Sequence, residues 1–342
     1  MSRVAVVLFN LGGPDSLDSV QSFLYNLFSD PAIIGVPQPI RWLLAKLISH
    51  RRTPIAQEIY NRIGGKSPLL ELTTKQAVAL KSNLSDFAED VEVFVCMRYW
   101  HPMAKEVAKS VKAYNPNKVI LLPLYPQYST TTVLSSLQDW KKAAEKVDLA
   151  VQTYSICCYP CDSGLIAAQA DGVNKTIKKT GPNTRILFSA HGLPRKIVDK
   201  GDPYQWQVEQ TATAVINVMG GYEDWTVCYQ SRVGPLEWIG PSTEDELRRA
   251  ADDGVGVIVV PIAFVSEHSE TLVELDIEYR ELATELGITR YDRVPALGTH
   301  PTFVVGLSDL VRKACAKPNL MPYGGANGNR LCPAQYRKCP VS

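Results

Sequence analysis

Residues 185–194 read R-I-L-F-S-A-H-G-L-P, and the rest of the chain is interpreted around them. The apolar run predicts a buried strand, and Gly192 and Pro194 end its extended backbone. His191 is therefore expected at the carboxyl end of a strand, the edge at which open α/β sheets bind ligands. A histidine at this place is also compatible with a turn residue bonded to a backbone carbonyl. The surrounding motifs distinguish a ligand-binding histidine from a structural one.

Strands and helices alternate on both sides of this stretch. In the first half, apolar runs predict strands at 4–10, 91–97 and 118–124, and helical patterns cover 20–27, 72–84, 104–114 and 133–144. In the second half, strands are predicted at 185–191, 225–229 and 255–262, and helices begin near 164, 204, 243, 267 and 302. Such alternation predicts parallel sheets with helices on both faces.

The two halves resemble each other in detail. V-L-F-N-L-G-G-P ends at Pro14 and matches I-L-F-S-A-H-G-L-P, which ends at Pro194. V-I-L-L-P, which ends at Pro123, matches V-I-V-V-P, which ends at Pro261. We therefore predict a duplicated doubly wound unit. The first half is expected at 1–150, the second at 151–316 and a cysteine-containing tail at 317–342.

Composition excludes several function classes. The chain has 342 residues and a formal net charge of +1, without the basic and aromatic clusters of a nucleic-acid-binding surface. No G-x-G-x-x-G follows the first strand, so no NAD or other nucleotide is expected. The sequence shows neither a signal peptide nor an apolar stretch of the roughly 20 residues that span a bilayer. A cytoplasmic protein is predicted, and its eight cysteines are expected to be reduced thiols, metal ligands or core residues rather than disulfides.

Residues 30–70 interrupt the alternation and are predicted to be an insertion. Trp42, Leu43 and Leu47 stand close to the basic group His50-Arg51-Arg52. This mixture is typical of an apolar lip over a cleft that also touches lipid. A helical hairpin packed on the core explains it equally well. We call residues 30–70 the lip segment.

A group of carboxylates follows the strand at 255–262. Glu267, Glu270, Glu274 and Glu278 recur at helical spacing, which predicts one acidic helix face. Such faces are usually solvated, but this one starts where a buried strand ends and where a helix amino terminus favours anions. A neutral imidazole and a carboxylate from two strand ends can hold a divalent ion loosely. There is no H-E-x-x-H motif, so metal transit is predicted rather than a structural zinc site.

Eight motifs in register resemble the ferrochelatase family from Val4 to about Ala316. They are L-F-N-L-G-G-P, R-R-T-P, Y-N-R-I-G-G-K-S-P, M-R-Y-W-H-P, L-Y-P-Q-Y-S, S-A-H-G-L-P, Q-S-R-V-G-P-L-E-W-I-G-P and F-V-S-E-H-S-E-T-L-V-E-L-D-I-E-Y. The resemblance implies two similar Rossmann-like halves, each a four-stranded parallel sheet flanked by helices, with the active cleft between them. It also implies insertion of ferrous iron into protoporphyrin IX to form protohaem, the last step of haem synthesis.

The resemblance assigns roles to individual residues. His191 and Glu270 match the metal-binding pair, and His191 is also the expected acceptor of pyrrole protons. The acidic track that passes protons or metal matches Glu267, His268, Glu274 and Glu278. Porphyrin contacts match Arg98 and Ser67 for the propionates and Tyr60, Leu11 and Trp238 for the cleft. Leu11 stands where other members carry Met or Tyr, so no axial role is implied for it.

Some ferrochelatases hold a 2Fe-2S cluster through one internal cysteine and three near the carboxyl terminus. The resemblance implies Cys158, Cys332 and Cys339 as ligands here, with a fourth drawn from Cys157, Cys161 or Cys315. The chain departs from the animal pattern, because Thr130 rather than Cys follows L-Y-P-Q-Y-S. Free tail thiols are the alternative.

Other functions remain open from sequence alone. The chain is also compatible with a chelatase for coproporphyrin or a cobalt substrate, and with a tetrapyrrole carrier that inserts no metal. Peripheral contact with the inner membrane and a homodimeric state are further expectations.

Overall fold

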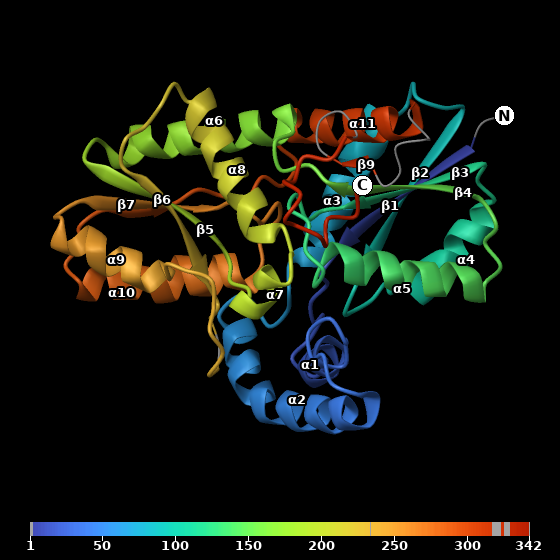
Figure 1. The fold of residues 1–342 in the computed structure, drawn as a ribbon, viewed down its shortest axis with the longest axis horizontal. Coiled ribbons are helices and arrows are strands. Elements are labelled where there is room, and N and C mark those ends of the chain that lie inside the picture. Colours follow the sequence, from blue (N-terminus) through green and yellow to red (C-terminus); the bar gives the residue numbers. More distant parts are fainter. Residues whose placement is uncertain (1–2, 233, 317–322, 325–328, 342) are drawn as a thin grey trace. The chain divides into compact units, whose positions relative to one another are not determined.

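The computed structural model describes residues 3–232, 234–316, 323–324 and 329–341 (Figure 1). The chain divides into two compact units. The first comprises residues 1–125, 129–157 and 308–323, and the second comprises 126–128, 158–307 and 324–342.

The first unit is built on a sheet with the strand order β2-β1-β3-β4-β9. Its strands are β1 (Arg3–Asn10), β2 (Asp90–Met97), β3 (Lys118–Pro123), β4 (Gln152–Cys158) and the two-residue β9 (Tyr323–Gly324). β1 pairs in parallel with β2 and β3, and β3 pairs in parallel with β4. Val4 to Phe9 are all buried, which explains why β1 is almost entirely apolar.

Helices cover the first sheet. α4 (Ala104–Tyr114) and α5 (Val133–Lys146) pack on the face that carries Ala5, Val7 and Phe9. α3 (Leu69–Asn83) contacts β2, and the end of α11 (Pro301–Ala316) is tied to the segment after α3 by the Arg312–Asp86 ion pair. α11 contributes residues to both units.

The lip segment forms one long helix and not a hairpin. α2 (Gln38–Asn61) packs against α1 (Val20–Phe28), and Tyr60 at its end joins the apolar cluster around Phe23. Much of the rest of α2 has no apolar partner, because Ile40, Trp42, Leu43, Leu47 and Ile55 are exposed by 40% or more.

The second unit repeats the plan of the first. Its parallel sheet has the order β6-β5-β7-β8, formed by β5 (Thr184–His191), β6 (Trp225–Gln230), β7 (Gly256–Pro261) and β8 (Tyr291–Arg293). α6 (Ser163–Thr180) and α8 (Tyr204–Val218) pack on one face around Ile186 and Phe188. α9 (Thr243–Asp252) and α10 (Tyr279–Glu285) cover the other face around Leu187. The short α7 (Arg195–Asp199) follows β5.

A π-helix, η1 (Glu270–Glu278), lies between β7 and α10. Its hydrogen bonds join residues five apart, so each turn is wider than in an α-helix, and such helices occur mostly at functional sites. The sequence predicted one helix starting at Glu267; the helix instead starts at Glu270, and its first nine residues are π-helical.

The predicted duplication is confirmed, because β2-β1-β3-β4 and β6-β5-β7-β8 follow the same order. Pro123 and Pro261, matched by sequence, end the equivalent strands β3 and β7. The residue patterns missed β4 and β8. β4 begins with exposed polar residues and β8 has only three residues, so neither shows a long apolar run. Within the described residues, no helix is both long and apolar enough to cross a membrane.

Candidate active site

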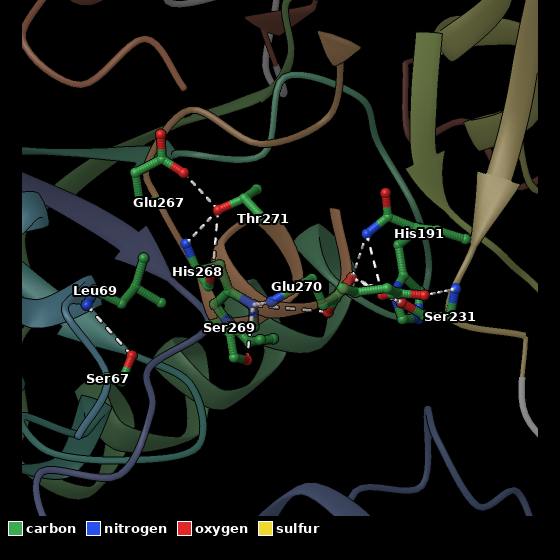
Figure 2. A network of polar contacts seen from close by, with 12 residues as sticks. Ser67, Leu69, His191, Ser231, Glu267, His268, Ser269, Glu270 and Thr271 are labelled. Carbon is green, nitrogen blue, oxygen red and sulfur yellow. Dashed lines mark hydrogen bonds and ion pairs between the residues drawn. The ribbon is translucent and has the colours of Figure 1, made fainter. Parts of the chain in front are cut away.

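His191 is the last residue of β5, as the sequence predicted. Its partner in the parallel register is Gln230, the last residue of β6, and Ser231 follows directly. Glu270, the first residue of η1, reaches the same edge of the sheet. His191 Nδ1 lies 2.8 Å from Glu270 Oε2, which joins the two residues predicted to form the metal pair (Figure 2).

Ser231 connects Glu270 to the next carboxylate. Its hydroxyl donates to Glu270 Oε2 at 3.1 Å and also to Glu274, while its backbone N–H donates to Glu274 Oε1 at 2.8 Å. Tyr279 Oη donates to the same Glu274 oxygen at 3.0 Å. Ser231 holds this position with φ of 58°, a left-handed conformation that is uncommon outside glycine. A continuous chain of hydrogen bonds therefore runs from His191 through Glu270 and Ser231 to Glu274.

The charges of this chain are set by burial and by neighbours. Burial lowers the pKa of His191, but the charge and hydrogen bond of Glu270 and the charge of Glu274 outweigh it, so the pKa is raised. Because 44% of the His191 side chain stays accessible, water tempers both effects. Burial opposes ionisation of Glu270, yet His191 and His268 hold its pKa well below the usual range. Burial and the charge of Glu270 raise the pKa of Glu274 to about 7.

His268 is buried beside this chain. Its ring stacks on Phe264, and its Nδ1 accepts from the backbone N–H of Glu270 at 3.4 Å. Burial lowers the pKa of His268 and so favours the neutral ring. Its Nε2 is buried without a hydrogen-bond partner among the described residues.

The outer members of the predicted acidic face lie elsewhere. Glu267 precedes η1 and pairs with Arg293 at 3.0 Å, and Figure 2 shows its side chain directed toward Thr271 rather than His191. Glu278 is exposed at the end of η1. The prediction of one acidic helix face over all four glutamates is therefore wrong at Glu267, because the helix starts only at Glu270.

In the first unit, the predicted porphyrin contacts gather after β1. A Cβ atom added to Gly13 would lie 2.4 Å from Ser67 Oγ and 3.7 Å from Tyr60 Oη, so these three residues meet closely. Leu11 packs on the apolar cluster that contains Tyr60. Only glycine at position 13 leaves room for this approach.

Arg98 follows β2 and is held by carboxylates. Its Nη2 lies 2.7 Å from Asp30 Oδ2, its Nε donates to Ser135 Oγ at 2.7 Å, and its Nη1 lies 3.6 Å from Asp139. Tyr99 Oη also donates to Asp30 at 2.8 Å. Arg98, predicted to hold a propionate, therefore also anchors Asp30, where the lip segment begins.

Trp238 lies close to His191 in the second unit. It forms an antiparallel bridge with Pro194, and a Cβ atom added to Gly192 would lie 3.3 Å from Trp238 Cε3. Its indole N–H is buried without a partner among the described residues. The ring therefore flanks the strand end that carries His191.

The ferrochelatase family model matches residues 3–315. The chain belongs to the ferrochelatase family. A ferrochelatase from Caulobacter vibrioides is 54% identical over 99% of this chain and 97% of its own. One from Pelagibacter ubique is 49% identical over 99% of this chain and 98% of its own. SirB from Bacillus subtilis with Fe3+ has a TM-score of 0.53 at 12% identity, covering 93% of this chain and 98% of that one, which shows a shared fold.

Membership of the ferrochelatase family makes the chain a metal chelatase, a lyase that inserts ferrous iron into a porphyrin in haem synthesis. The sequence predicted His191, Glu270 and Glu274 for the site, and the structure joins them in one hydrogen-bonded chain, but no sequence pattern pointed to Ser231, Arg293 or Asp30. Ser231 stands in the motif Q-S-R-V-G-P, yet only the folded structure shows that its hydroxyl donates to both Glu270 and Glu274. Arg293 and Asp30 carry no local signal, because their partners are distant in sequence.

Proposed function

We propose that the chain inserts ferrous iron into protoporphyrin IX, and that His191 and Glu270 receive the iron and the pyrrole protons. The observation that carries this proposal is the 2.8 Å contact between His191 Nδ1 and Glu270 Oε2 at the end of β5. Glu270 fixes the imidazole by its Nδ1, so Nε2 is the atom left for chemistry. An imidazole and a carboxylate are suitable ligands for Fe²⁺, and two ligands leave positions for exchange.

Metal insertion releases two protons from the porphyrin nitrogens, so the reaction needs a base and an exit. The hydrogen bonds from Glu270 through Ser231 to Glu274 and Tyr279 supply a route away from His191. We assign proton removal to this route. Glu267 is not part of it, because Arg293 and Thr271 occupy its carboxylate.

Porphyrin is flat and apolar with two carboxylates at its edge. Leu11, Tyr60 and Trp238 are the apolar contacts of the proposal, and Ser67 and Arg98 are the polar ones. Coproporphyrin carries two additional carboxylates. The exposed apolar residues of α2 favour the less polar protoporphyrin.

The test is an anaerobic insertion assay with protoporphyrin and coproporphyrin, each with ferrous iron and with cobalt. The proposal predicts the highest kcat/KM for protoporphyrin with iron. A kcat/KM at least tenfold higher for coproporphyrin would make coproporphyrin the substrate. Binding of both porphyrins without metal insertion would identify the protein as a carrier.

We also propose a 2Fe-2S cluster in the second unit. Gln207 Nε2 of α8 donates to Cys158 Sγ at 3.5 Å and to Cys332 Sγ at 3.1 Å, so one amide joins the internal and the tail cysteine. The Cys332 thiol also hydrogen-bonds to Cys339, which lowers the pKa of Cys339 to about 6 and raises the pKa of Cys332 above its usual value. Cys339 is therefore the thiol of this pair that ionises first, and the thiolate is the form that binds iron.

Three observations favour Cys161 as the fourth ligand. Cys158 and Cys161 have C-x-x-C spacing across a turn in which Asp162 N donates to Tyr159 O at 3.1 Å. Cys157 is next to Cys158 on β4, and neighbouring strand residues point to opposite faces. Cys315 lines a cavity with Val4 and Lys118, near the amino ends of β1 and β3.

The donor set of this proposal consists of thiols only, the ligand type that holds 2Fe-2S clusters. A 2Fe-2S cluster with four cysteine ligands needs only a pair of thiolates at each iron. It would tie residues 329–341 to the second unit, where Lys338 N already donates to the O atom of Gly201, just before α8, at 3.0 Å. When bound, such a cluster carries one electron at a time.

Anaerobically purified protein should then contain about two irons per chain and show visible absorbance that dithionite bleaches. Cys161→Ser should abolish the colour, whereas Cys157→Ser and Cys315→Ser should retain it. Colourless, iron-free wild-type protein would contradict the cluster, and a coloured Cys161→Ser variant would contradict this fourth ligand.

Finally, we propose that α2 places the protein on the cytoplasmic face of the inner membrane. Trp42, Leu43 and Leu47 are 47%, 60% and 43% exposed, and Lys46 lies 4.1 Å from the Trp42 ring centre. Apolar side chains beside basic ones are suited to an anionic lipid surface.

Vesicles with anionic lipid should bind the wild type and release the Trp42→Ser/Leu43→Ser/Leu47→Ser variant. Val78→Ser is the matched control, because Val78 is 65% exposed on α3. Equal binding of all three proteins would contradict the proposal.

A further inference from the structure

Arg293 is the last residue of β8, and its side chain is only 8% exposed. Its guanidinium binds two carboxylates at once. Nε and Nη2 donate to the two oxygens of Asp276 at 2.8 and 2.6 Å, and Nη1 donates to Glu267 Oε1 at 3.0 Å. Such a bidentate contact fixes the orientation of the carboxylate as well as neutralising its charge, and the ammonium group of lysine cannot reproduce it.

The two carboxylates stand on either side of the catalytic residues. Glu267 lies three positions before η1, and Asp276 lies within it. Glu270 and Glu274 fall between them in sequence. One rigid, buried guanidinium therefore fixes the distance between the segment before the π-helix and the middle of the π-helix.

Glu267 extends this attachment to the start of η1. Its Oε1 also accepts from Ala296 N at 2.9 Å, and its Oε2 accepts from Thr271 Oγ1. Thr271 Oγ1 in turn accepts from the backbone N–H of His268 at 2.9 Å. The first residues of η1 are thus held from one side by Glu267 and from the other by Ser231.

A π-helix is rare and occurs mostly as a single turn inside an α-helix. Residues 270–278, E-T-L-V-E-L-D-I-E, contain neither glycine nor proline, so their own preference does not select the wider turn. Contacts outside the helix have to select it. Arg293 supplies the only guanidinium contact shorter than 3.5 Å to a carboxylate of η1 among the described residues.

We propose that Arg293 is a positioning residue for iron insertion: it holds η1 in its π-helical form, in which Glu270 reaches His191 and both Glu270 and Glu274 reach Ser231. This inference rests on the proposed role of the His191–Glu270 pair. Arg293 itself touches neither of these residues. Its effect on the reaction is transmitted through the backbone of η1.

The test compares Arg293→Met and Arg293→Lys with Arg290→Met. Arg290 stands just before β8 and donates to the carbonyl oxygens of Pro182 and Asn183 at 2.6 and 3.0 Å, without contact to η1. Arg293→Met should lower kcat/KM for iron about 10- to 100-fold, the usual effect of losing a residue behind a metal ligand, while KM for porphyrin changes less than about twofold. The kcat/KM of Arg293→Lys for iron should lie between those of Arg293→Met and the wild type. The kcat/KM of Arg290→Met should match the wild type.

Arg293→Met leaves two partly buried carboxylates, 22% and 29% exposed, without their shared guanidinium and can fail to fold. The Glu267→Gln/Asp276→Asn/Arg293→Met variant removes all three charges and keeps the fold measurable. The proposal predicts that this variant is folded and still reduced in kcat/KM for iron, with η1 shortened or α-helical in its crystal structure.

A folded triple variant with iron kinetics within twofold of the wild type would overturn the role of Arg293. Equal losses of kcat/KM for iron and for porphyrin would overturn it as well, because they would indicate a general disturbance of the fold. Failure of the proposed function would appear differently, as full activity in His191→Ala or Glu270→Gln whatever the Arg293 variants do.

Discussion

The Asp30–Arg98 pair offers a quantitative test of how the lip segment is anchored. Asp30 is 4% exposed and accepts from Arg98, Tyr99, Ser135 and the backbone N–H of Ala32. Removing one partner of such a pair leaves the other charge buried without its main counter-ion, which costs roughly 3–5 kcal/mol. Asp30→Asn and Arg98→Met should each lose about this much unfolding free energy. The double variant should lose far less than their sum.

Urea denaturation of the four proteins gives the coupling energy directly. Lys75→Met is the control, because the Lys75–Glu71 pair is 60% and 66% exposed and should contribute less than about 1 kcal/mol. If the two single losses add within about 0.5 kcal/mol, the pair is not coupled and the reasoning fails. The same variants separate the two roles of Arg98. Arg98→Met should raise the porphyrin KM, whereas Asp30→Asn should not, because it leaves the guanidinium in place.

Two further predictions concern single side chains. In the metal-free protein, burial raises the pKa of Glu274 to about 7, above the value near 4.5 in the unfolded chain. The contribution of Glu274 to the free energy of unfolding is therefore complete below pH 4.5 and is lost as the pH rises through 7. Glu274→Gln should therefore gain stability relative to the wild type between pH 4.5 and 7, by up to about 3 kcal/mol in urea titrations, and a constant difference would contradict the pKa. Gly13→Ala puts a Cβ atom 2.4 Å from Ser67 Oγ, so it should cost about 1–3 kcal/mol and raise the porphyrin KM. Gly35→Ala, whose Cβ would meet nothing closer than 3.7 Å, should do neither, and equal behaviour of the two variants would refute the close approach.

The sequence predicts the fold well where its signals are local and periodic. The apolar runs around Val4 and Ile186 mark the central strands of both sheets, and the matched Pro123 and Pro261 reveal the duplication. β8 is not predicted, because its three residues, Y-D-R, are too few and too polar to show a strand pattern. Its neighbour β7 is a clear apolar run. The fold is thus predictable from its buried centre and less so at its edges.

The candidate site divides in the same way. His191 and Glu270 follow apolar strands, so their position at the sheet edge could be predicted. The sequence could not predict that Glu267 points away from Glu270. Glu267 pairs with Arg293, which lies 26 residues further along the chain. Helical spacing assumes 3.6 residues per turn, and the π-helix breaks that assumption.

The central claim is that His191 and Glu270 act on the metal while the porphyrin is held by other residues. The most direct measurement is porphyrin binding and iron insertion by the His191→Ala protein under anaerobic conditions, with Glu270→Gln beside it. The account predicts porphyrin affinity within about threefold of the wild type and insertion reduced by about 10²-fold or more, as expected when a general base is removed. Insertion above roughly a tenth of the wild-type rate by the His191→Ala protein would contradict the assignment.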